Sequence, residues 1–326
     1  MLDQEGDVIQ LPDPSGLAFD LIQRLDGEVQ VSALSKNPYF PVLEPILRTR
    51  GWLVTLRDAL SDLLATRSAL SREIAAFAHL YPNDLDWHFK LLSRKRVLVV
   101  GVGGIGTNVS FALCANGVGS LTIVDPDIVD ATNLNRQFLF SADDIGLKKV
   151  DVVARELGRR FPATKVRPIP YTFDDVSLAS NLAVDADLIV ICGESTVLHD
   201  SPHLCDGVAI MLSGYQGAVG VIGPLVQPQR GSACWSCLMD RYKRPAMRHV
   251  EKSALTRASS WNPSGFAINS LTGSICSNVC IGYLSEQASY EERIGVQFRV
   301  SSASFQVDTV RIEPTSCSHT TVRPYE

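Results

Sequence analysis

The chain has 326 residues, of which 45% are hydrophobic and 20% are charged, and this composition excludes an intrinsically disordered protein. Its length allows one large or two modest domains, and its net charge of −5 leaves no overall basic footprint for nucleic acid. The sequence indicates no signal peptide and no membrane span, so we expect a cytoplasmic protein whose 8 cysteines are reduced thiols.

The N-terminal segment predicts a small winged-helix-like α+β domain. Strands are expected at Val8–Leu11 and Trp52–Val54 and helices at Leu17–Leu25 and Phe40–Arg50, and between the helices Val29 and Val31 alternate as in a strand. This order resembles the peptide-binding domain of ribosomal-peptide maturation enzymes, which adds a leader peptide as an extra strand on an open sheet edge. The alternative is an extension used only for dimer contacts.

A stretch rich in Leu and Ala, Leu56–Leu80, predicts a long helix that Pro82-Asn83-Asp84 ends. We therefore expect a peptide-binding domain with a linker helix over residues 1–80 and a second, larger domain over residues 81–326.

The larger domain begins with a strand, a glycine turn, a helix and a second strand. Val97–Val100 form a short apolar run typical of a strand covered on both faces, a helix is expected at Ile105–Asn116, and Leu121–Val124 form the next strand. Such an order predicts an α/β, doubly wound, Rossmann-like sheet.

Four glycines lie where the first strand would meet the helix, in a G-x-G-x-x-G pattern: Gly101, Gly103, Gly104 and Gly106. In such a turn backbone N–H groups can approach a phosphate at the helix N-terminus. Asp125 ends the second strand, where an acid accepts a ribose hydroxyl. The pattern predicts a nucleotide site, and the alternative is a tight turn with no ligand.

A dense group of polar and cationic residues follows Asp125, and its members are Asp127, Asn133, Arg136, Gln137 and Lys149. Two cations beside a helix N-terminus suit a triphosphate and its departing pyrophosphate better than a hydride-transfer cofactor. The alternative is a surface charge cluster.

These residues, read as V-D-x-D, N-L-x-R-Q and G-x-x-K, resemble the ThiF/MoeB/HesA adenylating enzymes, relatives of the ubiquitin-activating enzymes. The resemblance implies that the glycine turn holds ATP, that Asp125 contacts the ribose, and that Arg136 and Lys149 contact the phosphates. It also implies a homodimer in which an Arg upstream of the glycine turn reaches the neighbouring ATP site. Arg72 is the candidate, and a solvent-facing helix residue is the equal alternative.

The later elements are expected as a helix at Val150–Arg160, strands at Lys165–Ile169 and Ala186–Cys192, two strands within Gly207–Pro228, a helix at Phe266–Leu284 and closing strands within Gln297–Ile312. Glu194 follows a strand at its carboxyl end, where the resembled family has an Asp that binds Mg²⁺. Glu is one methylene longer, so its metal contact, direct or through water, stays open.

The cysteine pattern bears on a structural zinc and on the mechanism. The resemblance implies a zinc held by Cys234, Cys237, Cys317 and His319, although position 320 is Thr where the family has Cys, and a lost zinc site is the alternative. Cys192, among others, is expected to be a core residue. Because residues 238–274 contain no cysteine, we expect a substrate nucleophile, not an enzyme thiol, to attack the acyl adenylate.

Taken together, the sequence predicts ATP-dependent adenylation of a carboxylate in a ribosomally made precursor peptide, with Mg²⁺ as cofactor, as in enzymes of microcin-C-type or pantocin-type antibiotic maturation. One alternative is activation of a sulfur-carrier protein for thiamine or molybdopterin synthesis. A second is a non-catalytic scaffold for a leader peptide.

Overall fold

The computed structural model describes residues 12–25, 29–50, 53, 70–80, 85–173, 176–193, 208–227, 232–235, 237–238, 264–287 and 291–312. The chain divides into two compact units, residues 1–90 and residues 91–326, and each is described by itself. In neither unit is any described helix long and apolar enough to cross a membrane.

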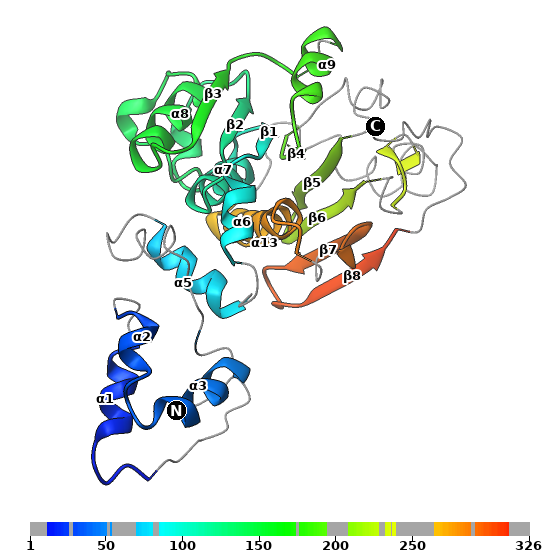
Figure 1. Cartoon of the computed structure of the whole chain (residues 1–326). Helices are drawn as coiled ribbons and strands as arrows, with labels where there is room; N and C mark the ends of the chain where they lie inside the picture. Colours follow the sequence, from blue (N-terminus) through cyan, green and yellow to red (C-terminus); the bar gives the residue numbers. More distant parts are fainter. Residues whose placement is uncertain are drawn as a thin grey trace. The chain divides into compact units, whose positions relative to one another are not determined.

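The described elements of the N-terminal unit are helices: α1 (Leu17–Gln23), α2 (Val31–Leu34), α3 (Phe40–Thr49), α5 (Ser71–Leu80) and most of α6 (Leu85–Leu92) (Figure 1). The buried side chains of Leu21, Leu34, Leu43 and Leu47 bring α1, α2 and α3 together in a small core. The helices expected at Leu17–Leu25 and Phe40–Arg50 are therefore present.

One expected strand of this unit is wrong. Val31 begins the short helix α2 instead, in which Leu34 is buried in the small core while Val31 is 50% exposed. The strand expected at Val8–Leu11 lies outside the described residues, and of Trp52–Val54 only Leu53 is described. The winged-helix-like arrangement thus stays a prediction.

The larger unit is built on one 8-stranded sheet, and its order is β3-β2-β1-β4-β5-β6-β7-β8. The strands are β1 (Arg96–Val100), β2 (Ser120–Val124), β3 (Lys165–Ile169), β4 (Leu188–Ile191), β5 (Ala209–Gln216), β6 (Val219–Val226), β7 (Val296–Ser301) and β8 (Val307–Arg311). In this order, neighbouring strands from β3 through β2, β1 and β4 to β5 pair parallel. The pairs β5–β6, β6–β7 and β7–β8 are antiparallel. The predicted α/β, Rossmann-like fold is confirmed.

Helices cover this sheet, chiefly α7 (Gly104–Ala115), α8 (Lys149–Arg160), α9 (Val176–Val184) and α13 (Phe266–Leu284). α7 packs on α13, which crosses β5, β6 and β7, while α8 lies against β3 (Figure 1). Leu98 and Val100 share a hydrophobic cluster with Leu182 of α9. Because side chains alternate along a strand, Val97 and Val99 point to the other face, and both sets are buried.

The order of the strands locates the site. After β1 the chain continues into β2 on one side, and β4 joins β1 on the other, so β1 lies at the point where the direction of strand order changes. In open α/β sheets ligands bind outside the carboxyl ends of the strands at such a point.

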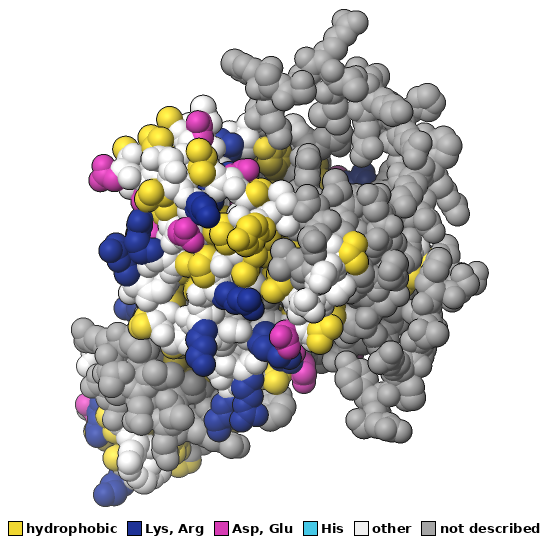
Figure 2. Space-filling view, turned by 90° about the horizontal axis from the view of Figure 1, so that it is seen from above, with side chains coloured by type: hydrophobic (Ala, Val, Ile, Leu, Met, Phe, Trp, Pro, Cys, Tyr) yellow, Lys and Arg dark blue, Asp and Glu magenta, His cyan; other side chains and the backbone are white. Residues whose placement is uncertain are grey.

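The surface seen from above carries Lys and Arg side chains interspersed with apolar and acidic ones (Figure 2). In that view the described residues form no single continuous basic face.

Candidate active site

The glycine turn between β1 and α7 is held by close backbone packing. Gly101 has φ +88°, a conformation that L side chains rarely adopt, and a Cβ there would lie 2.8 Å from the backbone N of Gly193. A Cβ on Gly106 would lie 1.9 Å from the carbonyl oxygen of Gly101. These two glycines let the helix and the end of β4 close on the turn.

The other two glycines of the turn differ in what they face. A Cβ on Gly104 would lie 2.3 Å from Oδ1 of Asn269, which is on α13, whereas one on Gly103 would meet nothing within 4 Å. Open space at Gly103, directly before the first residue of α7, fits an anion bound by the N-terminal N–H groups of that helix.

Asp125 ties the end of β2 to this turn. Its Oδ2 accepts a hydrogen bond from the backbone N of Val102 (2.8 Å), and its Oδ1 accepts one from the backbone N of Asp127 (2.9 Å). The side chain is buried. Each carboxylate oxygen can accept more than one hydrogen bond, so the expected ribose contact is compatible with this structural role and stays a prediction.

Lys149 and Asp127 form a short ion pair, with 2.8 Å between Nζ and Oδ2. The Lys149 side chain is 8% exposed and that of Asp127 is 61% exposed. Lys149 is also the first residue of α8, where the helix dipole disfavours a cation. Its charge is therefore balanced by Asp127, and its expected phosphate contact stays a prediction.

The segment between β2 and α8 carries Asn133, Arg136 and Gln137. Asn133 is buried, and its Oδ1 accepts a hydrogen bond from the backbone N of Asp130 (3.1 Å), which closes a capping box on a 3₁₀ turn. Nη1 of Arg136 donates to the carbonyl oxygen of Thr132 (2.7 Å) and to Oδ1 of Asn135 (2.8 Å). A guanidinium has five N–H donors, so Arg136 keeps donors for a ligand.

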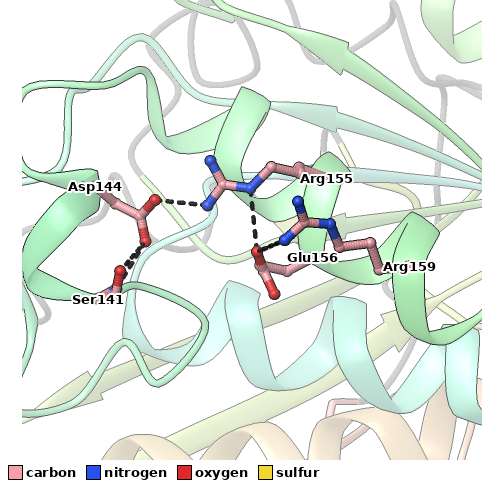
Figure 3. A network of polar contacts seen from close by, with 5 residues as sticks. All are labelled: Ser141, Asp144, Arg155, Glu156 and Arg159. Carbon is pink, nitrogen blue, oxygen red and sulfur yellow. Dashed lines mark hydrogen bonds and ion pairs between the residues drawn. The ribbon is translucent and has the colours of Figure 1, made fainter.

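A polar network fixes the same segment to α8 (Figure 3). Asp144 is buried, accepts from both the backbone N and Oγ of Ser141 (2.8 and 2.7 Å), and contacts Arg155 at 2.5 Å. Arg155 also contacts Glu156, which Arg159 contacts in turn. Burial raises the pKa of the Asp144 carboxyl group, but the hydrogen bonds from Arg155 and Ser141 outweigh it, and the pKa is lowered.

A cavity of about 390 Å³ lies beside the turn, over the carboxyl ends of β4 and β5. The predicted residues that line it are Gly103, Gly104, Arg136 and Gln137. Asp125 and the Lys149–Asp127 pair are not among its lining residues. The structure thus brings Arg136 and Gln137 together with the glycine turn.

Several lining residues were missed by the sequence reasoning, among them Cys192, Ser213, Tyr215 and Asn269. The only signal for Ser213 and Asn269 was a polar residue inside an apolar stretch. Cys192, expected in the core, borders the cavity instead, because it directly follows β4. Burial raises the pKa of its thiol, and so does the neighbouring Cys276 thiol, which makes Cys192 a poor nucleophile.

The remaining predicted site residues are less completely placed. Glu194 directly follows Gly193 but lies outside the described residues, as do Cys317 and His319. Arg72 is an exposed residue of α5. The backbone N of Cys237 donates to Sγ of Cys234 at 3.3 Å, and no group of three or more metal-binding side chains gathers among the described residues.

Comparison with known proteins gives matches in sequence and in structure. The molybdopterin-synthase adenylyltransferase of Escherichia coli K12 is 31% identical over 173 residues, which cover 50% of this chain and 66%, just under two thirds, of that protein. The microcin C7 biosynthetic enzyme MccB, in complex with N-formylated MccA, has a TM-score of 0.71 at 21% identity and covers 95% of this chain, which spans 92% of MccB. The structure of PaaA has a TM-score of 0.68 at 18% identity, and the match covers 88% of this chain and 98% of PaaA.

Structural similarity at these identities shows the fold alone, and family membership rests on the sequence. The characteristic sequence of the ThiF family matches residues 71–319, which is well over half of the chain. The match includes the glycine turn, the segment with Arg136 and Gln137, and Lys149. The chain therefore belongs to the ThiF family.

Proposed function

We propose that this protein is an ATP-dependent adenylating enzyme that activates a carboxylate of a ribosomally made precursor peptide. The observation that carries the proposal is the cavity in which Arg136 faces the same space as the open side of the glycine turn. An anion-binding helix N-terminus and a cation with unused donors are the two groups that phosphoryl chemistry needs at one place.

The chemistry follows from the arrangement of these groups. N–H groups of the turn and of the first residues of α7 bind the α-phosphate, and Asp125 accepts a ribose hydroxyl. The substrate carboxylate oxygen attacks the α-phosphorus, the bond to the β-phosphate oxygen breaks, and pyrophosphate leaves. Arg136 and Lys149 stabilise the leaving charge.

A divalent ion and the fate of the adenylate complete the proposal. Glu194 would hold Mg²⁺, as the resemblance to the family implies, and Mg²⁺ supplies further charge neutralisation at the phosphates. The raised pKa of Cys192 keeps the cavity thiol protonated, so we propose that the acyl adenylate is attacked by a nucleophile of the substrate itself.

The likeness to MccB supports a peptide substrate, because that enzyme was solved with MccA and the likeness extends over both units of this chain.

We further propose that the N-terminal domain binds the leader peptide and that Cys234 and Cys237 form half of a zinc site. We also propose that the enzyme is a cytoplasmic homodimer in which Arg72 acts across the interface. A monomeric mass at working concentration together with full activity would contradict the dimer.

A second candidate function has a specific observation behind it. The 31% identity to a molybdopterin-synthase adenylyltransferase favours a reaction in which the same active site activates a small sulfur-carrier protein. A carrier that ends in Gly-Gly and a short peptide differ in size, so they can be compared directly as substrates.

The test is exchange of labelled pyrophosphate into ATP, measured with pooled short peptides and, separately, with a Gly-Gly-ended carrier. We expect peptide-dependent exchange with AMP as the released nucleotide. Arg136→Ala should slow it by about 10²-fold or more. Arg159→Ala is the matched control, because the Arg159 side chain is 70% exposed and forms an ion pair with Glu156 of the same helix. Release of ADP, or exchange with the carrier alone, would overturn the peptide proposal.

A further inference from the structure

A second cavity, the edge cleft, lies on the large sheet away from the candidate active site. Its volume is about 290 Å³, and it shares no lining residue with the active-site cavity. Arg96, Ser120 and Lys165, the first residues of β1, β2 and β3, line it, and β3 is the outermost strand in the order of the sheet (Figure 1). The edge cleft therefore lies at the amino ends of strands whose carboxyl ends face the nucleotide turn.

The strand register places the polar residues of the edge cleft on one face of the sheet. Two rows of direct partners cross β1, β2 and β3, one made of Leu98, Thr122 and Arg167, and the other of Arg96, Ser120 and Lys165. Side chains two positions apart on a strand point to the same face, so both rows share a face. On this face Leu98 packs in a cluster with Leu182 of α9, whereas the cations of β3 stay exposed.

The cations of the edge cleft are not equally neutralised. Nη1 of Arg96 lies 3.3 Å from Oδ1 of Asp185, and its Nε lies 3.7 Å from Oδ2 of Asp187. Asp185 also lines the cleft, and this pairing balances its charge. Lys165 and Arg167 form no ion pair with any residue that the structure describes. They lie about 6.6 Å apart along β3, close enough for both to contact one anion.

The edge cleft changes in character across its width. Its wall at β1 and α9 is apolar and is made by Leu98, Leu182 and Ala186. Next to this wall β2 presents the hydroxyls of Ser120 and Thr122, which have no hydrogen-bond partner within the described part of the chain. Neighbouring strands lie about 4.8 Å apart, so the cations of β3 are about 10 Å from the apolar wall. The complementary ligand is apolar at one end, polar in the middle and anionic at the other end.

We propose that the edge cleft binds a nucleoside monophosphate, with its base on the apolar wall, its ribose over β2, and its phosphate at Lys165 and Arg167. A phosphate monoester carries close to two negative charges at neutral pH and has three acceptor oxygens, which suits two unpaired cations. A carboxylate brings one charge only, and inorganic phosphate leaves the apolar wall uncovered. A cavity of this volume is at the lower end of the range for small-ligand sites, which favours a monophosphate over a triphosphate.

The test is calorimetry on the full chain saturated with a non-hydrolysable ATP analogue, which occupies the candidate active site. The probes are AMP and UMP, a purine and a pyrimidine nucleotide, with adenosine and inorganic phosphate as fragments. At least one nucleotide should bind, and each fragment should bind at least about tenfold more weakly, because it lacks one end of the ligand. Arg167→Gln should weaken nucleotide binding at least about tenfold, the effect of losing a hydrogen bond from a charged group, and should leave adenosine unchanged.

Arg94→Gln is the matched control, because Arg94 is an exposed cation two residues before β1 that does not line the edge cleft. It should leave nucleotide affinity within about twofold. Failure of both nucleotides to bind, equal affinity in Arg167→Gln, or inorganic phosphate that binds as tightly as the nucleotides would overturn the proposal. So would a second ATP analogue per chain that Arg167→Gln abolishes, because the cleft would then take a triphosphate. The measurement needs no reaction, so its outcome is separate from whether pyrophosphate exchange occurs.

Discussion

Gly106→Ala is the sharpest test of how the nucleotide turn is built. The added Cβ would lie 1.9 Å from the carbonyl oxygen of Gly101, whereas ordinary contacts begin near 3.4 Å, so the two must separate by about 1.5 Å. Both atoms belong to backbone that is held by β1 and α7, and neither can rotate away. Overpacking of a buried site costs about 1–3 kcal/mol, or more when backbone must move.

The assay is thermal unfolding together with affinity for a non-hydrolysable ATP analogue. For a domain of this size each kcal/mol shifts the midpoint by about 2–4 °C, so Gly106→Ala should melt about 2–12 °C lower and bind the analogue at least about tenfold more weakly. Gly158→Ala is the control: Gly158 is exposed within α8 with no atom within 4 Å of a Cβ, and Ala should raise stability by about 0.5–1 kcal/mol. A Gly106→Ala protein with unchanged melting and affinity would refute the packing argument.

Three further predictions concern charge and domain roles. Lys149→Met should slow pyrophosphate exchange by about 10²-fold or more but alter melting little, because its partner Asp127 is largely exposed; a large stability loss would show that the pair is structural. Folding lowers the pKa of Asp144 from its ordinary 3.8, so near this pH the folded state binds fewer protons than the unfolded state. The ionised Asp144 carboxylate therefore stabilises the fold above pH 3.8, and this stabilisation is lost as the pH falls through the lowered pKa. Asp144→Asn should therefore melt lower than wild type at pH 7, and the gap should close in acid; a gap independent of pH would contradict this. Removing residues 1–55 should weaken peptide binding far more than ATP binding in calorimetry, and equal peptide affinity would rule out the leader-binding role.

The sequence predicted the nucleotide half of the fold well because its signals are local. Apolar runs such as Val97–Val100 and a glycine turn before Ile105 are determined by neighbours in the chain, and β1 and α7 lie within a residue or two of expectation. Val31 was misjudged because two apolar residues two positions apart fit a strand, whereas the contact that decides the helix is made by Leu34 with its core.

The cavity was predicted only in part for the same physical reason. Gly103 and Arg136 belong to short motifs, but Ser213 and Asn269 reach the cavity through strand order and helix packing, which no local pattern encodes. Cys192 was expected in the core because its neighbours in the sequence are apolar. The sequence pattern does not show that β4 ends directly before it, at the cavity.

The two hydrogen bonds of Asp125 have a consequence for how the enzyme meets its nucleotide. Because the carboxylate already holds the backbone N of Val102, the turn is ordered before ATP arrives, and the conformational entropy of ordering it is lost during folding and not during binding. Such a preorganised turn should show slow exchange of the Val102 amide hydrogen in the nucleotide-free protein, and ATP should slow it only slightly further.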